Sequence, residues 1–300
     1  MMAIAMLNSI GILAEPVLIS TRSHGKPIVD YPIVNQFNHL IVLVEIDGKD
    51  ILLDLTNPYS PVDFIGVEAL NGKGFLLNAA EPQWVTINPK TSKDVIAANL
   101  ELSPNGQLAG EVKTRCKGYS AVSERKILAK QPTGNFWLER IGEQFTDVEI
   151  SDMQFQNAVD LDQPLTNSFQ IEINDAAQVL NDFIYLNPTL YSNFLENPFK
   201  LETREYPVEI PYPFQQQTII NIKIPIDYEV VELPEPAKMV LPEGGGQLLY
   251  SITEKDGTIQ VNTRIDVRQL IHEPHEYPAL KTFFDLIIEK QGEQIVLKKK

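Results

Sequence analysis

From about residue 81 to the C-terminus, short runs of apolar and polar residues are separated by turn residues. This pattern predicts strands joined by tight connections, and the regular spacing favours a mostly antiparallel β-sandwich. The expected strands cover residues 95–102, 108–116, 169–173, 183–186, 218–224, 229–233, 247–253 and 258–267. Two connections are predicted hairpin turns, Ser103-Pro104-Asn105-Gly106 and Asp256-Gly257.

Helices are few in this β-region. Residues 122–130 and 135–144 are compatible with short helices, and residues 277–289 predict a longer one that is followed by a short strand, 294–297. The longer helix has a single apolar stripe, as expected of a helix that packs on a sheet. That stripe consists of Leu280, Phe283, Phe284, Ile287 and Ile288.

The N-terminal residues have a different pattern. Residues 1–13 are apolar, but they lack the basic start of a signal peptide, and Gly11 stands where a helix would end. An amphipathic helix is therefore favoured over a signal peptide. Its apolar residues at helical spacing are Met2, Ala5, Met6 and Ile10.

A strand at 14–21 and a hairpin of strands 39–46 and 50–55 around Asp47-Gly48 are expected next. The sequence thus predicts an α+β protein in two parts, residues 1–78 and 79–300. A further division of the second part near 197–206 is the alternative. If residues 1–78 form only part of a core, an apolar strand and helix face are left uncovered, so we expect this part to pack against the β-region or against a second chain, as in a homo-oligomer.

Charge and cysteine content exclude several classes of function. The net charge is −15, and the basic residues are scattered apart from Lys298-Lys299-Lys300. This distribution argues against nucleic acid and anionic membranes as partners. Cys116 is the one cysteine of the chain, so neither a disulfide nor a multi-thiolate metal site can form within it. No apolar run approaches the roughly 20 residues of a membrane helix.

His39 and Asp54 are the candidate catalytic residues. In a hairpin centred on Asp47-Gly48, position 39 pairs with roughly position 56, so the two side chains are within reach of a diagonal contact. A carboxylate beside an imidazole fixes its tautomer and orientation, which is the base-and-orienter half of a catalytic triad. Asp54 also interrupts an apolar series, where a buried carboxylate needs a partner. The alternative is a turn-capping Asp with a surface His.

Residues 2–77 resemble the C-terminal half of a transglutaminase-like domain, a papain-like core. The resemblance is carried by Ala5-Met6-Leu7, Gly11-Ile12, Ala14, Pro16-Val17-Leu18-Ile19, Phe37-Asn38-His39-Leu40 and Leu52-Leu53-Asp54-Leu55-Thr56. The remainder is similar to the β-rich C-terminal region of the same bacterial proteins, which are of the Bacteroidetes type. That similarity is carried by Tyr206-Pro207-Val208, Pro211-Tyr212-Pro213, Ile224-Pro225, Tyr228-Glu229-Val230, Leu233-Pro234, Glu276-Tyr277-Pro278-Ala279-Leu280, Phe283-Phe284 and Ile295-Val296-Leu297.

The resemblance implies that His39 is the general base and acid and Asp54 its orienting carboxylate. The nucleophilic cysteine of the family lies about two turns upstream of Ala5-Met6-Leu7, before the first residue of this chain. Cys116 lies downstream of both partners, in a predicted strand, and is expected to be a small core residue. The chain is therefore predicted to be a catalytically inert fragment of an enzyme that acts on amide bonds.

The alternative function is a non-catalytic binding or scaffold protein that recognises a protein or a glycan through the β-region. Relatives with these domains are commonly exported to the cell envelope or periplasm, whereas no targeting signal is recognised in this sequence. No cofactor is expected, and no metal site is predicted for the acidic residues Asp147, Glu149, Asp152, Asp160 and Asp162, which lack EF-hand spacing.

Three other features are interpreted structurally. His272-Glu273-Pro274-His275 is expected to be a loop because Pro274 prevents a regular helix through it. Gly244-Gly245-Gly246 is expected to be a flexible hairpin loop and not a phosphate site. Trp84 and Trp137 are expected in the core, with sugar stacking as the alternative.

Overall fold

The computed structural model describes residues 2–77 and 83–300. The chain forms an N-terminal unit of Met1–Thr91 with Val159–Asp162, and a C-terminal unit of Ser92–Ala158 with Gln163–Lys300. The boundary expected after residue 78 lies outside the described residues, and the division that the structure has falls after Thr91. Both sides of segment 197–206 belong to the C-terminal unit, and the alternative division there stays a prediction.

The described residues are mostly β, with four sheets and four α-helices. All their strand pairs are antiparallel except one, which agrees with the β-rich and mostly antiparallel fold predicted from the sequence. The partial papain/transglutaminase-like core remains a prediction.

The N-terminal unit is built on one five-stranded antiparallel sheet with the strand order β3-β2-β1-β4-β5. Its elements are α1 (Met2–Ser9), β1 (Ala14–Ile19), η1 (Arg22–His24), η2 (Val34–Gln36), β2 (His39–Ile46), β3 (Lys49–Leu53), η3 (Val67–Ala69), β4 (Lys73–Leu76) and β5 (Gln83–Thr86). The predicted hairpin is present as β2 and β3. Asp47 and Gly48 have φ values of 51° and 71°, as a two-residue turn of the primed type requires.

Helix α1 packs on this sheet with a different face from the one that the sequence suggested. Ile4 and Leu7 contact the small cluster of Ala14, Val42 and Val44. Among the residues predicted to form its apolar stripe, Met2, Met6 and Ile10 are exposed. This short helix is apolar on several sides, so helical spacing alone could not determine which side the sheet covers.

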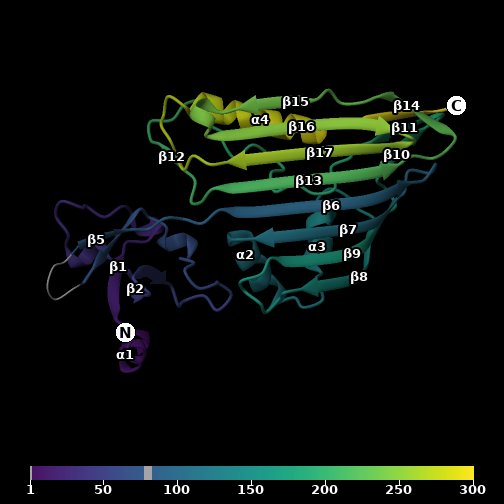
Figure 1. The fold of residues 1–300 in the computed structure, drawn as a ribbon. Coiled ribbons are helices and arrows are strands. Elements are labelled where there is room, and N and C mark those ends of the chain that lie inside the picture. Colours follow the sequence, from purple (N-terminus) through teal and green to yellow (C-terminus); the bar gives the residue numbers. More distant parts are fainter. Residues whose placement is uncertain (1, 78–82) are drawn as a thin grey trace. The chain divides into compact units, whose positions relative to one another are not determined.

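The C-terminal unit contains an eight-stranded sheet with the order β15-β16-β17-β13-β6-β7-β9-β8. Figure 1 shows it from the edge strand β15 to the edge strand β8. The strands of this sheet are β6 (Ser92–Leu102), β7 (Leu108–Lys117), β8 (Val148–Gln156), β9 (Leu165–Ile173), β13 (Phe214–Lys223), β15 (Ala237–Val240), β16 (Gly246–Lys255) and β17 (Thr258–Val267). At its centre β6 pairs in parallel with β13.

Two smaller sheets and three α-helices complete the unit. The sheets have the orders β10-β11-β19-β14 and β12-β18. The remaining elements are α2 (Tyr119–Leu128), α3 (Phe136–Gly142), β10 (Ala177–Leu180), β11 (Phe183–Leu186), β12 (Val208–Glu209), β14 (Tyr228–Glu232), η4 (Pro242–Gly244), β18 (Ile271–His272), α4 (Tyr277–Gly292) and β19 (Ile295–Lys299).

One face of the eight-stranded sheet is covered by two neighbouring cores. Along β16, Leu248 joins the core under α4, whereas Tyr250 and Ile252 on the same face join the core under the four-stranded sheet and α3. The predicted stripe of α4 is confirmed for Leu280, Phe283, Phe284 and Ile287, which are buried on β15–β17. The sheet-on-sheet packing corresponds to part of the expected sandwich, and α4 covers the rest.

The opposite face of the large sheet is polar. A row of amides crosses three neighbouring strands, since Asn221 Nδ2 donates to Asn99 Oδ1 at 2.8 Å and Gln260 Nε2 donates to Asn221 Oδ1 at 2.9 Å. Lys223 Nζ donates to Glu101 Oε1 at 2.9 Å. Among the described residues, no helix is both long and apolar enough to cross a bilayer.

Candidate functional site

His39 and Asp54 lie at the same end of the β2–β3 hairpin. His39 is the first residue of β2, and Asp54 directly follows β3. Because Val42 pairs with Leu53, this register places positions 39 and 54 diagonally across the two strands, where their side chains can meet. His39 Nε2 lies 3.5 Å from Asp54 Oδ2, so the contact expected from the turn position is present.

Hydrogen bonds from neighbouring residues fix the Asp54 carboxylate. Thr56 donates to Asp54 Oδ1 from its hydroxyl at 2.6 Å and from its backbone N–H at 3.2 Å. Gly66 N–H donates to Asp54 Oδ2 at 3.0 Å. The side chain is only 3% exposed, so these donors are the partners that a buried carboxylate needs.

Gly66 also leaves room for the carboxylate. A Cβ at this position would lie 3.0 Å from Asp54 Oδ2, which is closer than ordinary van der Waals contact. The local sequence therefore holds Asp54 in one position and orients it toward the ring.

The imidazole of His39 is less firmly held. Its side chain is 22% exposed, and Nε2 is buried without a hydrogen-bond partner among the described residues. A small approach of the ring would allow Nε2–H to donate to Asp54 and would leave Nδ1 as the basic nitrogen. Catalytic hydrogen bonds are often this long before a substrate binds.

Cys116 lies in the C-terminal unit, on β7, and is buried with Ala121 and Leu165. Burial raises the pKa of the Cys116 thiol, and the nearby carboxylates of Glu124 and Asp94 raise it further. A thiol in this environment is protonated and is a poor nucleophile. The expectation that Cys116 is a core residue is confirmed.

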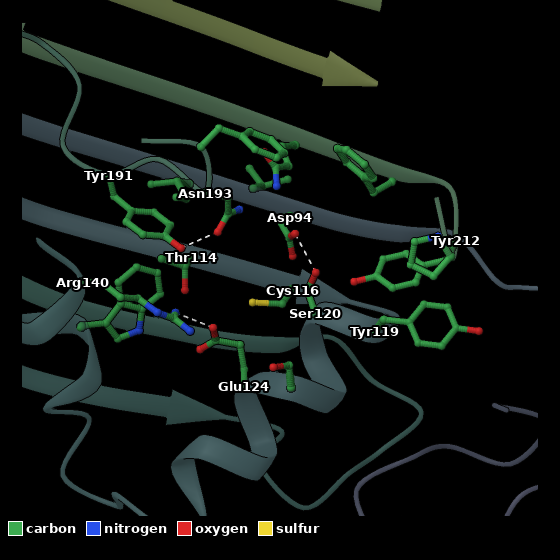
Figure 2. A pocket seen from close by; sticks show the side chains of 18 of the residues that line it. Asp94, Thr114, Cys116, Tyr119, Ser120, Glu124, Arg140, Tyr191, Asn193 and Tyr212 are labelled. Atoms are coloured by element: carbon green, nitrogen blue, oxygen red, sulfur yellow. Dashed lines mark hydrogen bonds and ion pairs between the residues drawn. The ribbon is translucent and has the colours of Figure 1, made fainter. Parts of the chain in front are cut away.

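The C-terminal unit contains a pocket of about 390 Å³ that the sequence did not reveal. It lies on the covered face of the large sheet, over the start of β6 and the end of β7, and α2, α3 and the segments around Tyr191 and Tyr212 form its walls. Figure 2 shows Asp94, Cys116 and Ser120 between an aromatic pair, Tyr119 and Tyr212, and a group around Arg140 and Tyr191. Its size is within the usual range of small-molecule sites.

Asp94 is the central acid of this pocket. Ser120 Oγ donates to Asp94 Oδ2 at 2.7 Å, and Ser92 Oγ lies 2.7 Å from Ser120 Oγ. Asp94 Oδ1 is buried and has no hydrogen-bond partner among the described residues. Burial raises the pKa of Asp94 to about 6, although the Ser120 hydrogen bond opposes this shift.

A second acid, Glu124, forms a buried ion pair in the same wall. Arg140 Nη1 lies 2.5 Å from Glu124 Oε1, while Glu124 Oε2 is buried without a partner in the described structure. Burial raises the pKa of Glu124, and Arg140 lowers it. The guanidinium of Arg140 also lies about 5 Å from the ring centres of Phe136 and Trp137.

Aromatic rings supply much of the remaining wall. Tyr119 and Tyr212 stack with ring centres 4.3 Å apart. At the other end, the Tyr191 hydroxyl donates to Asn193 Oδ1. Burial raises the pKa of both Tyr191 and Tyr212, and the charge of Asp94 contributes to each shift. The pocket thus combines two unsatisfied carboxylate oxygens with several aromatic faces.

Sequence reasoning missed this site because its residues come from segments up to about 120 positions apart, and no local motif links them. The alternation of residues along β6 was the available signal. Asp94 is on the same face of the strand as Ile96, Ala98 and Leu100, which predicts that its carboxylate faces the core side of the sheet.

The other sequence candidates lie elsewhere. His272 is buried in β18, where desolvation lowers its pKa, and His275 is exposed. Trp137 lines the pocket from the core, and Trp84 packs edge-on against Phe75 in the N-terminal unit. Within residues 2–77 and 83–300, no group of three or more His, Cys, Asp or Glu is arranged to hold a metal ion.

Comparisons with known proteins give few matches. No curated protein matches the chain. Over 98% of its length it resembles the crystal structure of a "putative protease" from Parabacteroides distasonis, with 13% identity and a TM-score of 0.48. The chain spans 42% of that protein, and a similarity this distant supports no functional argument. Residues 182–297, which extend from β11 through α4 into β19, match the family DUF3858, a domain of unknown function with a solved structure.

Proposed function

We propose that His39 and Asp54 are the base and the orienting carboxylate of a transglutaminase-like cysteine site that acts on amide bonds. The thiol of that site is not among these 300 residues, since Cys116 is a buried residue of the other unit. On this proposal the 300-residue chain by itself has no acyl-transfer activity, and the protein belongs to a lineage exported to the cell envelope.

One observation carries the proposal: a carboxylate that is 3% exposed and held by three donors faces an imidazole nitrogen at 3.5 Å. A carboxylate in that position selects the tautomer with the proton on Nε2, so Nδ1 remains free to accept a proton from a thiol. The motifs around Phe37-Asn38-His39-Leu40 and Leu52-Leu53-Asp54 give additional support through the family resemblance.

The tautomer can be tested on the 300-residue chain by long-range ¹H–¹⁵N correlation spectra of ¹⁵N-histidine-labelled protein. Neutral His39 is expected to carry its proton on Nε2. Asp54→Asn should redistribute the two tautomers, whereas Asp50→Asn, an exposed acid on the same hairpin, should not. A His39 spectrum that does not respond to Asp54→Asn would contradict the orienting role.

The enzymatic role can be tested through the gene sequence that precedes the codon for Met1. A Cys-x-Asp sequence followed by the start of an apolar helix supports the proposal. In a chain extended to include it, His39→Ala should reduce amide hydrolysis or transamidation about 10²–10⁴-fold. A stop codon directly upstream, or an activity that requires Cys116 and not His39, would overturn it.

The second candidate function is binding without catalysis by the C-terminal unit, and the pocket around Asp94 favours it. A pocket of about 390 Å³ with aromatic walls and unsatisfied acceptors is typical of a ligand site. The partner expected from the sequence was a protein or a glycan. Binding of any small probe in this pocket, lost on substitution of its lining residues, is the test of this candidate.

A further inference from the structure

We propose that the pocket around Asp94 binds an organic cation, an ammonium or guanidinium group on an apolar stem. This inference rests on the binding function proposed for the C-terminal unit and is independent of His39 and Asp54. The cation comes either from a free amine or from a lysine or arginine side chain of a polypeptide, and the two sources share this chemistry.

The first argument is the hydrogen-bond balance of the pocket. Its two buried unsatisfied carboxylate atoms, Asp94 Oδ1 and Glu124 Oε2, are acceptors when ionised. Leaving such atoms without a donor is expensive, so a ligand that completes the site should bring N–H groups. Nearby donors are already engaged, because Ser120 Oγ donates to Asp94 Oδ2 and Tyr191 donates to Asn193.

The second argument is charge. With both acids ionised, Asp94, Glu124 and Arg140 give the lining a net charge of −1, from two carboxylates and one guanidinium. Arg140 is already paired with Glu124 at 2.5 Å, which leaves Asp94 as the unneutralised charge. A ligand cation would neutralise that charge in a partly desolvated site, where charge-assisted hydrogen bonds are strong.

The third argument is the aromatic wall. The stacked rings of Tyr119 and Tyr212 lie at one end of the pocket and Tyr191 at the other, with Asp94 between them (Figure 2). Aromatic faces attract cations and accommodate apolar stems. A smaller hollow that shares Asp94, Tyr191 and Asn193 with the pocket extends the available space toward Gln291.

The charge of Asp94 makes the binding depend on pH. Because the pKa of Asp94 is raised to about 6, a cation should bind more weakly as the pH falls below 6 and Asp94 becomes protonated. Binding near pH 6 should release a proton, since the bound cation favours the ionised acid. The groups that interact with this charge are Ser120 and Glu124 of α2, Arg140 of α3, Cys116 of β7, and Tyr191 and Tyr212 of the two loops.

Isothermal titration calorimetry of the full chain tests the proposal. The probes are n-butylammonium and n-butylguanidinium as free cations and Nα-acetyl-lysine N-methylamide as a chain-borne cation, with n-butanol and Nα-acetyl-norleucine N-methylamide as neutral comparators. The cations should bind and the neutral comparators should not. Binding of the free cations alone identifies a small amine as the ligand, and binding of the blocked lysine identifies a polypeptide.

Variants separate the pocket from the general acidity of the chain. Asp94→Asn should weaken cation binding about tenfold or more and abolish proton release at pH 6. Glu101→Gln, the matched control on the open face of the sheet, changes the net charge equally and should have no effect. Tyr212→Leu should weaken binding about threefold to tenfold, and its control is Tyr206→Leu at an exposed position.

Three results would overturn the proposal. They are equal binding of lysine and norleucine probes, affinity that rises as the pH falls below 6, and equal effects of Asp94→Asn and Glu101→Gln. Binding of the neutral comparators that depends on Tyr212 would reject the cation while preserving a binding function for the unit. Absence of binding by every probe would reject both.

Discussion

Asp54 is buried and Asp94 is half-buried in a pocket wall, and their hydrogen-bond partners differ. Asp54 accepts three hydrogen bonds from Thr56 and Gly66, and both of its oxygens are engaged. Asp94 accepts one from Ser120, and its other oxygen has no partner in the described structure. The first acid is therefore built into its unit as a fixed group, whereas the second remains available to a ligand.

At Thr56 the expected effect is a loss of stability. Thr56→Val removes the hydroxyl that donates to Asp54 Oδ1 at 2.6 Å and keeps the side-chain shape. Because hydrogen bonds to charged groups contribute more than neutral ones, the free energy of unfolding should fall by about 2 kcal/mol. Urea denaturation measures the change, with Thr86→Val, on an exposed strand position of the same unit, as the control. Equal effects of the two substitutions would contradict this account of Asp54.

At Asp94 the expected effect is a gain of stability at high pH. Since its pKa is raised from 3.8 to about 6 in the folded state, the folded protein binds this proton more tightly than the unfolded chain. The charged acid therefore destabilises the fold above pH 6 by about 3 kcal/mol, and this penalty shrinks between pH 6 and 3.8 and is absent only below pH 3.8. Asp94→Asn should stabilise the protein at pH 8 and about half as much at pH 5, where the unfolded chain still ionises this acid. Urea unfolding at both pH values checks this, and a variant less stable at pH 8 would refute it.

At the scale of elements, short-range patterns predicted more than long-range ones. The turns at Asp47-Gly48 and Asp256-Gly257 were correct because the residues at each turn themselves favour positive φ, and each joins adjacent strands. The position of His39 beside Asp54 followed from the first turn. The face of α1 that packs and the pocket around Asp94 could not be predicted, since both depend on segments that meet only in the folded chain.

Helices α2 and α3 are joined by the ion pair of Glu124 and Arg140, whose side chains are 9% and 22% exposed. Arg140→Met should destabilise the protein by about 3 kcal/mol, because it leaves Glu124 buried and unpaired. The double variant Glu124→Met, Arg140→Met should recover most of this loss. Lys223→Met breaks an exposed pair with Glu101 and should change stability by less than about 1 kcal/mol. Denaturant midpoints of the wild type, Glu124→Met, Arg140→Met, the double variant and Lys223→Met give the comparison, and additive effects at Glu124 and Arg140 would argue against the pairing.

At the scale of the whole molecule, each unit has clusters of buried side chains formed by its own residues. The cores under α4 and under the four-stranded sheet are composed of residues of the C-terminal unit, and the cluster beneath α1 is composed of residues of the N-terminal unit. The division expected from the sequence, residues 1–78 and 79–300, stays a prediction. In the structure, β5 pairs with β4 and so belongs to the N-terminal unit, and composition does not report such strand pairing.

A fragment of residues 92–300 is expected to fold without the N-terminal unit, because its sheets and both cores lie within it. Circular dichroism should show β structure and one cooperative thermal transition. The full chain provides the reference. A fragment that aggregates or melts without cooperativity would show that the first 91 residues are needed for the fold.

The parallel pairing of β6 with β13 has a consequence for synthesis of the protein. Because Ser92 pairs with Phe214, β13 is synthesised more than a hundred residues after β6, the strand with which it pairs. At a synthesis rate of about 5–20 residues per second, one edge of β6 remains unpaired for roughly 6–25 seconds. During this interval the nascent chain exposes a long strand that could pair with other chains, and chaperone protection is most needed then.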